Sequence, residues 1–151
     1  MSDGESAERP SVIGGLPVAL FAFPGPVRDR LVAAILAGRK TATASLRCEY
    51  LPEGPDPLPE VGARSVVVDS QHRPVAVIET AEVRVLGLGD VDERFARDEG
   101  EGFETVAAWR AAHERFWTSA EFRAAAGGGV SAPTDGTQVV AERFRLVRTI
   151  Q

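Results

Sequence analysis

The segment that most constrains the fold is a run of β-branched residues from Val75 to Leu86. Valine occupies most of its odd-numbered positions, and an alternation of period two is typical of a β-strand with one face against a core. The same alternation places Glu79 on the largely apolar face. A carboxylate there has to be neutralised, paired or placed at a cavity, unless the strand lies at an edge and Glu79 reaches solvent. Its candidate partners are Arg47, Arg64 and Lys40.

The remaining elements follow from turn residues and periodicity. A helix is expected from Pro26 to a C-terminal glycine at Gly38, with Arg28, Asp29 and Arg30 opposite its apolar side. Two later helices are expected, one capped by Asp90 and ending at Gly100, the other spanning Phe103 to Thr118. Further strands are expected over residues 16–23, 41–50, 64–69 and 138–147, with loops over residues 51–60 and 124–137. This order predicts an α+β domain built on a small curved sheet or barrel.

Length and composition predict one soluble domain. Residues 1–15 are rich in Ser, Glu, Gly and Pro and are expected to form a flexible leader, with a single domain over residues 16–151. No apolar run is long enough to cross a membrane, and the first ten residues lack the apolar core of a signal peptide, so the expected location is the cytoplasm. Cys48, the single cysteine, excludes an internal disulfide and a cysteine metal site, and is expected to be a small buried hydrophobe.

The net charge of −5 argues against a protein that coats nucleic acid by bulk electrostatics. It leaves room for a local basic groove or for a pocket that takes a small nucleoside. No DNA partner and no membrane are expected, and the chain is expected to be a monomer or a homodimer.

Lys40 is the only lysine, against sixteen arginines. A lysine can lose its proton when it is partly buried, whereas arginine stays charged, so Lys40 is a candidate general base or a compact cation beside a reacting group. The alternative is a compositional bias that left one lysine on a solvated face. Its position supports the chemical interpretation, because Lys40 follows the glycine that ends a helix and precedes Thr43 by three residues.

Five segments together resemble an ASCH domain of the PUA-like superfamily. The first is the signature Gly-x-Lys-x-x-Thr within residues 38–45, Gly-Arg-Lys-Thr-Ala-Thr-Ala-Ser. The others are residues 75–83, 91–102, 109–113 and 139–147. The resemblance extends from about Ala19 to Val147 and is strongest to the longer bacterial ASCH proteins.

The resemblance implies a PUA-like small mixed β-barrel with flanking helices and a cleft lined by the signature. It also implies RNA or modified nucleosides as partners. Short bacterial relatives resemble amidohydrolases that deacetylate 4-acetylcytidine with the signature lysine and threonine and a glutamate on a later helix. These match Lys40, Thr43 and Glu99 here, with Glu101 and Glu79 as the other carboxylates that fit the third role.

These residues define a reaction hypothesis. Thr43 attacks the acetyl carbonyl, Lys40 takes its proton, and Glu99 orients Lys40 or handles the proton of the leaving amine. In a variant, Lys40 activates water and Thr43 only binds substrate. Carboxylates in the last turn of a helix face the negative end of its dipole, and this broken local rule also points to Glu99. The expected substrate-binding residues are Arg39, Thr41, Ser45, Arg47 and Glu79.

Two other functions fit the same residues. One is a single-stranded RNA-binding protein or a metal-dependent ribonuclease with Lys40 at the phosphate, with Mg²⁺ or Mn²⁺ held by Asp98, Glu99 and Glu101. The other is a module that binds RNA or another ligand without catalysis. Outside the ribonuclease alternative no cofactor or metal is expected. His113, Trp109, Phe116 and Trp117 share one helical stripe and are expected in the core.

Overall fold

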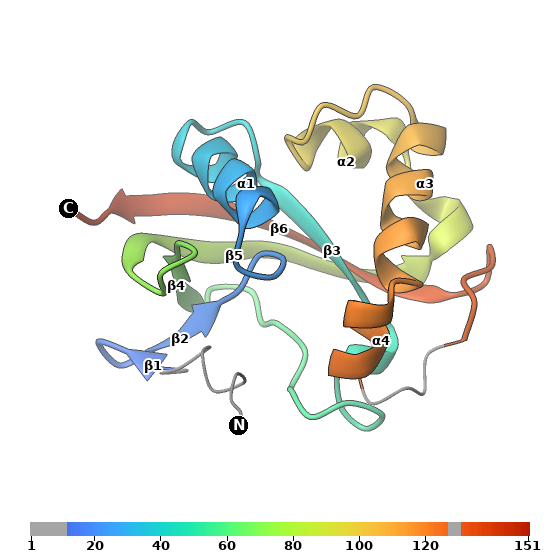
Figure 1. The fold of residues 1–151 in the computed structure, drawn as a ribbon, viewed down its shortest axis with the longest axis horizontal. Helices are drawn as coiled ribbons and strands as arrows, with labels where there is room; N and C mark the ends of the chain where they lie inside the picture. The colour runs from blue at the N-terminus through green and yellow to red at the C-terminus, as the bar shows by residue number, and fades with distance from the viewer. Residues whose placement is uncertain (1–11, 127–130) are drawn as a thin grey trace.

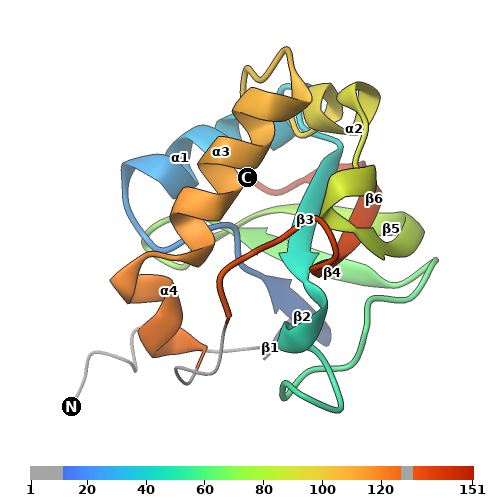
Figure 2. The ribbon, with the colours of Figure 1, turned by 90° about the vertical axis from the view of Figure 1, so that its right-hand side faces the viewer.

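The computed structural model describes residues 12–126 and 131–151 and contains one mixed sheet with helices packed beside it (Figures 1 and 2). The strands are ordered β1-β2-β4-β5-β6-β3 across the sheet. Their bounds are Val12–Ile13 (β1), Leu16–Ala19 (β2), Ala42–Leu46 (β3), Arg64–Val68 (β4), Pro74–Gly87 (β5) and Gln138–Thr149 (β6). β2 and β4 are parallel, and all other neighbours are antiparallel.

The long strand predicted from residue 75 is confirmed as β5, which spans 14 residues. It pairs with β4 on one side and β6 on the other, and two register shifts along its pairing with β6 curve the sheet. The α+β class is confirmed. The barrel is not, because β1 and β3 lie at opposite ends of the strand order and the described strands form an open sheet.

Within the described residues, four α-helices accompany the sheet: Pro26–Leu36 (α1), Glu93–Asp98 (α2), Val106–Trp117 (α3) and Ala120–Ala125 (α4). The N-cap of α2 is Asp92, whose carboxylate accepts from Phe95 N, so the prediction of Asp90 as the cap was wrong. Asp90 instead ends a short 3-10 turn that follows β5. α4 was not predicted, although Ser119 caps it by accepting from Phe122 N.

Two other local predictions needed correction. The strand expected over residues 41–50 ends at Leu46, where a 3-10 turn over Arg47–Glu49 leaves the sheet. Cys48, in that turn, is exposed and not buried. The expected leader lies outside the described residues up to position 11, while residues 12–15 form β1 and the turn to β2.

β3 runs between α1 on one side and α3 with α4 on the other (Figure 1). Below α2 and α3, one core cluster is built around Trp109 and Trp117, both at most 1% exposed. A second cluster lies under α1 and includes Phe21 and Phe144, whose rings meet at 5.9 Å. No helix in the described part of the chain is long and apolar enough to span a membrane.

Arg28 was expected on the polar side of α1, but it is 1% exposed. Its guanidinium donates to the carbonyl oxygens of Phe21 at 3.2 Å and Ala22 at 2.7 Å. These bonds hold the β2–α1 loop in a turn in which Ala22 has a left-handed φ of 62°. Such a conformation is unusual for a residue with a Cβ, and the loop it stabilises forms one wall of the pocket described next.

Candidate functional site

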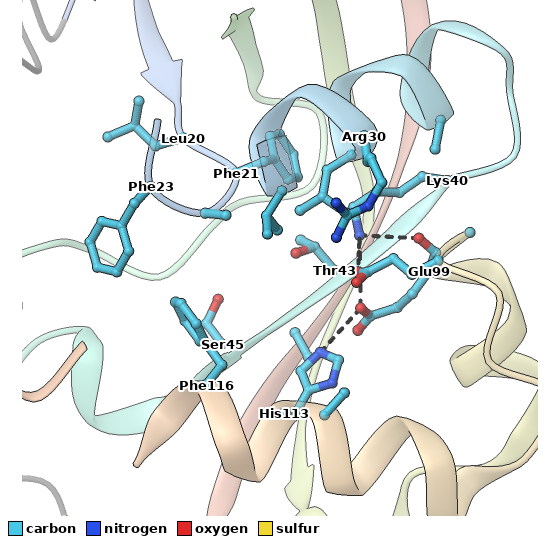
Figure 3. Close-up of a pocket in the computed structure, with 18 of the residues that line it drawn as sticks. Leu20, Phe21, Phe23, Arg30, Lys40, Thr43, Ser45, Glu99, His113 and Phe116 are labelled. Carbon is cyan, nitrogen blue, oxygen red and sulfur yellow. Dashed lines mark hydrogen bonds and ion pairs between the residues drawn. The ribbon is translucent and has the colours of Figure 1, made fainter. Parts of the chain in front are cut away.

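A cavity of about 970 Å³ lies between the β2–α1 loop, α1, β3, the end of α2 and α3 (Figure 3). Of the residues proposed from sequence, five line it: Arg39, Lys40, Thr43, Ser45 and Glu99. Glu101, considered as an alternative to Glu99, lines it as well. The cavity therefore brings together Lys40 and Glu99, which lie 59 positions apart in the chain.

Lys40 is positioned by the end of α1. Gly38 adopts a left-handed φ of 81°, as expected of a helix C-terminal glycine. The main-chain nitrogens of Arg39 and Lys40 then both donate to Ala34 O, at 2.9 and 3.1 Å. This turn directs the Lys40 side chain inward, so that only 2% of the residue remains exposed.

The ammonium of Lys40 has a full set of oxygen acceptors. Nζ lies 2.8 Å from Ala42 O, 3.2 Å from Glu99 O and 3.3 Å from Glu101 Oε2. A lysine ammonium has three protons to donate, so these contacts use all of them. Glu99 Oε1 lies a further step away, at 3.8 Å.

Gly100 allows the end of α2 to reach Lys40. A Cβ built at Gly100 would lie 2.5 Å from Arg39 O and 2.6 Å from Lys40 Cα, and the residue has a left-handed φ of 69°. Next to it, Thr41 N donates to Asp98 O at 2.8 Å. The close backbone approach brings Glu99 and Glu101, on either side of the glycine, to the lysine.

Glu99 joins Lys40 to His113. Its side chain is 1% exposed, and Oε1 lies 3.2 Å from His113 Nε2. The other ring nitrogen, Nδ1, lies 2.9 Å from Trp109 O, which can only accept, so Nδ1 carries a proton. The contact between Nε2 and the carboxylate then requires a second proton between them, which makes His113 and Glu99 an imidazolium–carboxylate pair. Glu99 Oε2 is buried and accepts no N–H or alcohol hydrogen bond from the described residues, but the carboxyl group of Glu101 interacts with that of Glu99.

The charges of this cluster shift its pKa values apart. Burial by itself would raise the pKa of Glu99, but the ammonium of Lys40 and the hydrogen bond with His113 outweigh it and lower the pKa. Burial, with the charge of Glu99, raises the pKa of Glu101 despite Lys40. Burial opposes protonation of His113, but the carboxylate of Glu99 raises its pKa above the ordinary value. One carboxylate is therefore held ionised beside another that takes up a proton readily.

Thr43 and Ser45 lie two residues apart on β3 and both face the cavity. Ser45 Oγ accepts from the Tyr50 hydroxyl at 2.9 Å, and burial raises the pKa of Tyr50 to about 12. The Thr43 hydroxyl has no hydrogen-bond partner within residues 12–126 and 131–151. Across the sheet Thr43 is in register with Glu142, whose Oε2 accepts from the Thr80 hydroxyl at 2.7 Å.

Three of the predicted substrate-binding residues lie elsewhere. Thr41 packs against the end of α2, with its hydroxyl 3.4 Å from Asp98 O. Arg47 donates to Leu51 O at 2.8 Å, in the turn after β3. Glu79 pairs on the sheet with Arg64 at 3.0 Å and Arg145 at 3.1 Å, and these arginines lower its pKa.

The carboxylates of the acidic segment contact different cations. Asp98 contacts Arg143 on β6, Glu99 and Glu101 contact Lys40, and Glu99 also contacts His113. Within the described residues no group of three His, Cys, Asp or Glu side chains is arranged to hold a metal ion.

Several residues of the cavity were not predicted from the sequence. His113 was assigned to the core because it follows the stripe of Trp109 and Trp117; it does stack on Trp109, with ring centroids 4.2 Å apart, but its other edge reaches Glu99. Phe116 was assigned there too, yet it is 38% exposed and meets Phe23 at the cavity. Arg30, expected only on the polar side of its helix, and Arg115, for which no role was predicted, also line the cavity. No sequence periodicity signals these contacts, because each joins different elements.

Comparison with known proteins agrees with the motif. The family model described as ASCH domain matches residues 19–148. Two solved structures superpose well. One, a protein from Enterococcus faecalis V583, is 31% identical with a TM-score of 0.67, covering 80% of this chain and 68% of that one. The other, an ASCH domain from Lactobacillus crispatus JV V101, is 30% identical with a TM-score of 0.69, covering 85% and 79%. A comparison with curated proteins found no match.

Proposed function

The chain belongs to the ASCH domain family, and we propose that within this RNA-associated family it is a hydrolase for a modified nucleoside, similar to a 4-acetylcytidine amidohydrolase. One observation carries the proposal. Lys40 and Glu99 are buried together at the floor of a cavity whose wall presents the unpartnered hydroxyl of Thr43. Buried charges are costly unless they are paired, and perturbed carboxylates in a cleft are typical of catalytic sites.

The first step assigned to the site is proton transfer within it. Lys40 must lose a proton before it acts as a base, and Glu101 Oε2 lies 3.3 Å from Nζ with a raised pKa. Moving one proton from Nζ to Glu101 leaves a neutral amine beside a neutral acid, a pair that low polarity favours over separated charges.

The neutral amine then serves the acyl transfer. It takes the proton of the Thr43 hydroxyl as Oγ1 bonds to the acetyl carbon, and returns a proton to N4 as the C–N bond breaks. Water then hydrolyses the acetyl ester on Thr43 and releases acetate. In the alternative route, the amine deprotonates a water that attacks directly, and Thr43 hydrogen-bonds the substrate.

Glu99 has a separate role in this scheme. Its Oε1 is held by His113 and Lys40, which fixes the carboxylate in place. Its Oε2 is buried, and the carboxyl group of Glu101, once it has taken up the proton, is the neighbour placed to donate to Glu99. Glu99 therefore positions Lys40 and Glu101 for the proton transfer.

Cleavage or binding of RNA through Lys40 is supported less well. All three ammonium protons already have acceptors within the protein, so a phosphate at Nζ would have to displace them. The carboxylates that a divalent ion would need are divided between Lys40 and Arg143. For these reasons the hydrolase is the preferred function.

The test is a paired assay of the purified protein with 4-acetylcytidine and with single-stranded RNA, each with and without Mg²⁺ or Mn²⁺. Deacetylation that is lost in Lys40→Arg and in Thr43→Val supports the proposal. Thr149→Val is the matched control, because Thr149 is exposed at the end of β6. RNA cleavage lost in Lys40→Arg would establish the ribonuclease instead, and ligand binding without turnover would establish a binding module.

Covalent catalysis by Thr43 has its own readout. Quenching the reaction early and measuring the intact mass detects an acetyl group on the protein. The group should be absent from Thr43→Val. Full turnover with no acetylated species, in a protein whose Thr43→Val variant stays active, would favour direct attack by water.

A further inference from the structure

Three arginines at the cavity have no ion-pair or hydrogen-bond partner among the described residues. Arg30 on α1, Arg39 in the turn after α1, and Arg115 on α3 all line it, and all three are exposed. Within the described part of the chain none of them forms an ion pair. They approach the cavity from two sides, since α1 and α3 flank β3 (Figure 1).

The arginines outside the cavity are of both kinds. Six of them are paired with carboxylates: Arg64, Arg73, Arg97, Arg110, Arg143 and Arg145. Five others form no ion pair with the described residues: Arg47, Arg84, Arg94, Arg123 and Arg148. What distinguishes Arg30, Arg39 and Arg115 is that they line one cavity together. The chain has five more acidic than basic residues, so acceptors for the cavity arginines are plentiful in the sequence. Unneutralised cations around one cavity in an acidic protein create a local positive potential that attracts an anion.

Lys40 cannot supply that attraction by itself. Its three protons are directed to Ala42 O, Glu99 O and Glu101 Oε2, and the two glutamates balance its charge. The cavity therefore separates two kinds of cation: a compensated lysine at the floor, and free guanidinium groups that can meet phosphate with two parallel hydrogen bonds.

The same wall also presents aromatic surface. The rings of Phe23 and Phe116 lie 5.9 Å apart at a tilt of 46°, and Phe116 keeps 38% of its surface exposed although Trp117 beside it is buried. Figure 3 shows both rings at the cavity. An exposed phenyl face is a site on which a nucleobase can stack.

From these observations we propose that the cavity takes a phosphorylated nucleotide, with its phosphate on Arg30, Arg39 and Arg115 and a base against Phe23 and Phe116. The ligand is a free nucleotide or one unit of a single RNA strand, which share this chemistry. The inference deepens the proposed function, because it uses the same cavity and names the charge its substrate carries.

The test measures binding and not turnover. Isothermal titration compares cytidine, cytidine 5′-monophosphate, cytidine 3′-monophosphate and an RNA hexanucleotide. One of the monophosphates is expected to bind at least about tenfold more tightly than cytidine at low salt, because charge-assisted hydrogen bonds to phosphate are added. Affinity for the nucleotides, but not for cytidine, should fall as salt rises.

Substitutions assign the effect to residues. Arg30→Gln, Arg39→Gln and Arg115→Gln should each weaken nucleotide binding several-fold and leave cytidine binding unchanged. Arg94→Gln is the matched control, because Arg94 is exposed on α2, lies outside the cavity and forms no ion pair with the described residues. Phe116→Leu should weaken cytidine and nucleotides alike, because it removes the base platform.

The same titrations distinguish an RNA strand from a free nucleotide, and they distinguish failure of the phosphate site from failure of the proposed deacetylation. Tighter binding of the hexanucleotide with a steeper salt dependence identifies a strand, while equal binding of the best monophosphate identifies a free nucleotide. Equal affinity for cytidine and both monophosphates, or arginine variants that match Arg94→Gln, overturns the phosphate site even if 4-acetylcytidine is deacetylated. Preference for phosphate without any deacetylation would overturn the proposed reaction and leave the phosphate site standing.

Discussion

Gly100→Ala should lower the free energy of unfolding more than Gly102→Ala, the same change two residues away. The added Cβ would lie 2.5 Å from Arg39 O and 2.6 Å from Lys40 Cα. Both atoms belong to the main chain, so neither can rotate aside. The end of α2 would have to move away from the segment that carries Lys40.

The magnitude has two parts. Alanine in a left-handed conformation costs about 1–2 kcal/mol, and Gly100 has a φ of 69°. Forcing an extra methyl group into a packed contact adds about 1–3 kcal/mol. Gly100→Ala should therefore lower the free energy of unfolding by about 2–5 kcal/mol, which at about 2–4 °C per kcal/mol is a clear loss in Tm.

Gly102→Ala is the control that separates the steric cost at Gly100 from the conformational cost. Gly102 has a φ of 92° but nothing within 4 Å of a Cβ, so Gly102→Ala carries only the conformational cost. Urea denaturation of both variants measures the difference, expected to be about 1–3 kcal/mol. Equal destabilisation of the two would refute the close approach of α2 to Lys40. A second readout is turnover of 4-acetylcytidine, which Gly100→Ala should reduce by separating Glu99 and Glu101 from Nζ.

Three further results are expected. Lys40→Met should lower the free energy of unfolding by about 3–5 kcal/mol by leaving a buried carboxylate underpaired, and adding Glu99→Gln should recover part of that loss in urea denaturation. His113 has a raised pKa, so its ion pair stabilises the protein fully below pH 6.5 and less as pH rises through the folded pKa. The difference between wild type and His113→Gln should shrink from pH 5.5 to 9, and growth over that range would contradict the assignment. Glu79→Gln should leave turnover unchanged, because Glu79 pairs on the sheet; a large loss would place it in the site.

Local sequence signals predicted much of the fold. The β-branched alternation of β5 and the Pro26 and Gly38 boundaries of α1 act within one segment, and the structure has them as expected. The misses are also local. Asp92 and Asp90 are equally able to cap a helix. Which of them does so depends on where β5 and the 3-10 turn after it end. The six-residue α4 is too short for periodicity to reveal.

Local sequence patterns could not predict whether the sheet closes into a barrel. Whether β1 and β3 meet depends on strand order and curvature, which no single strand encodes. The burial of Arg28 likewise depends on the β2–α1 loop, whose carbonyl oxygens compensate its guanidinium.

The candidate site also has a part that the sequence predicts and a part that only the tertiary structure determines. Lys40 and Thr43 are recognisable from the sequence alone, because they lie three residues apart after a helix-ending glycine. This separation along the chain does not depend on the fold. The partners of Lys40 were decided by tertiary structure. Gly100 permits a backbone contact that brings Glu99 and Glu101 to Nζ, and α3 adds His113 from a stripe whose period resembles that of an ordinary core. Periodicity reports which face of an element is turned inward, whereas the charges that meet there depend on how the elements pack.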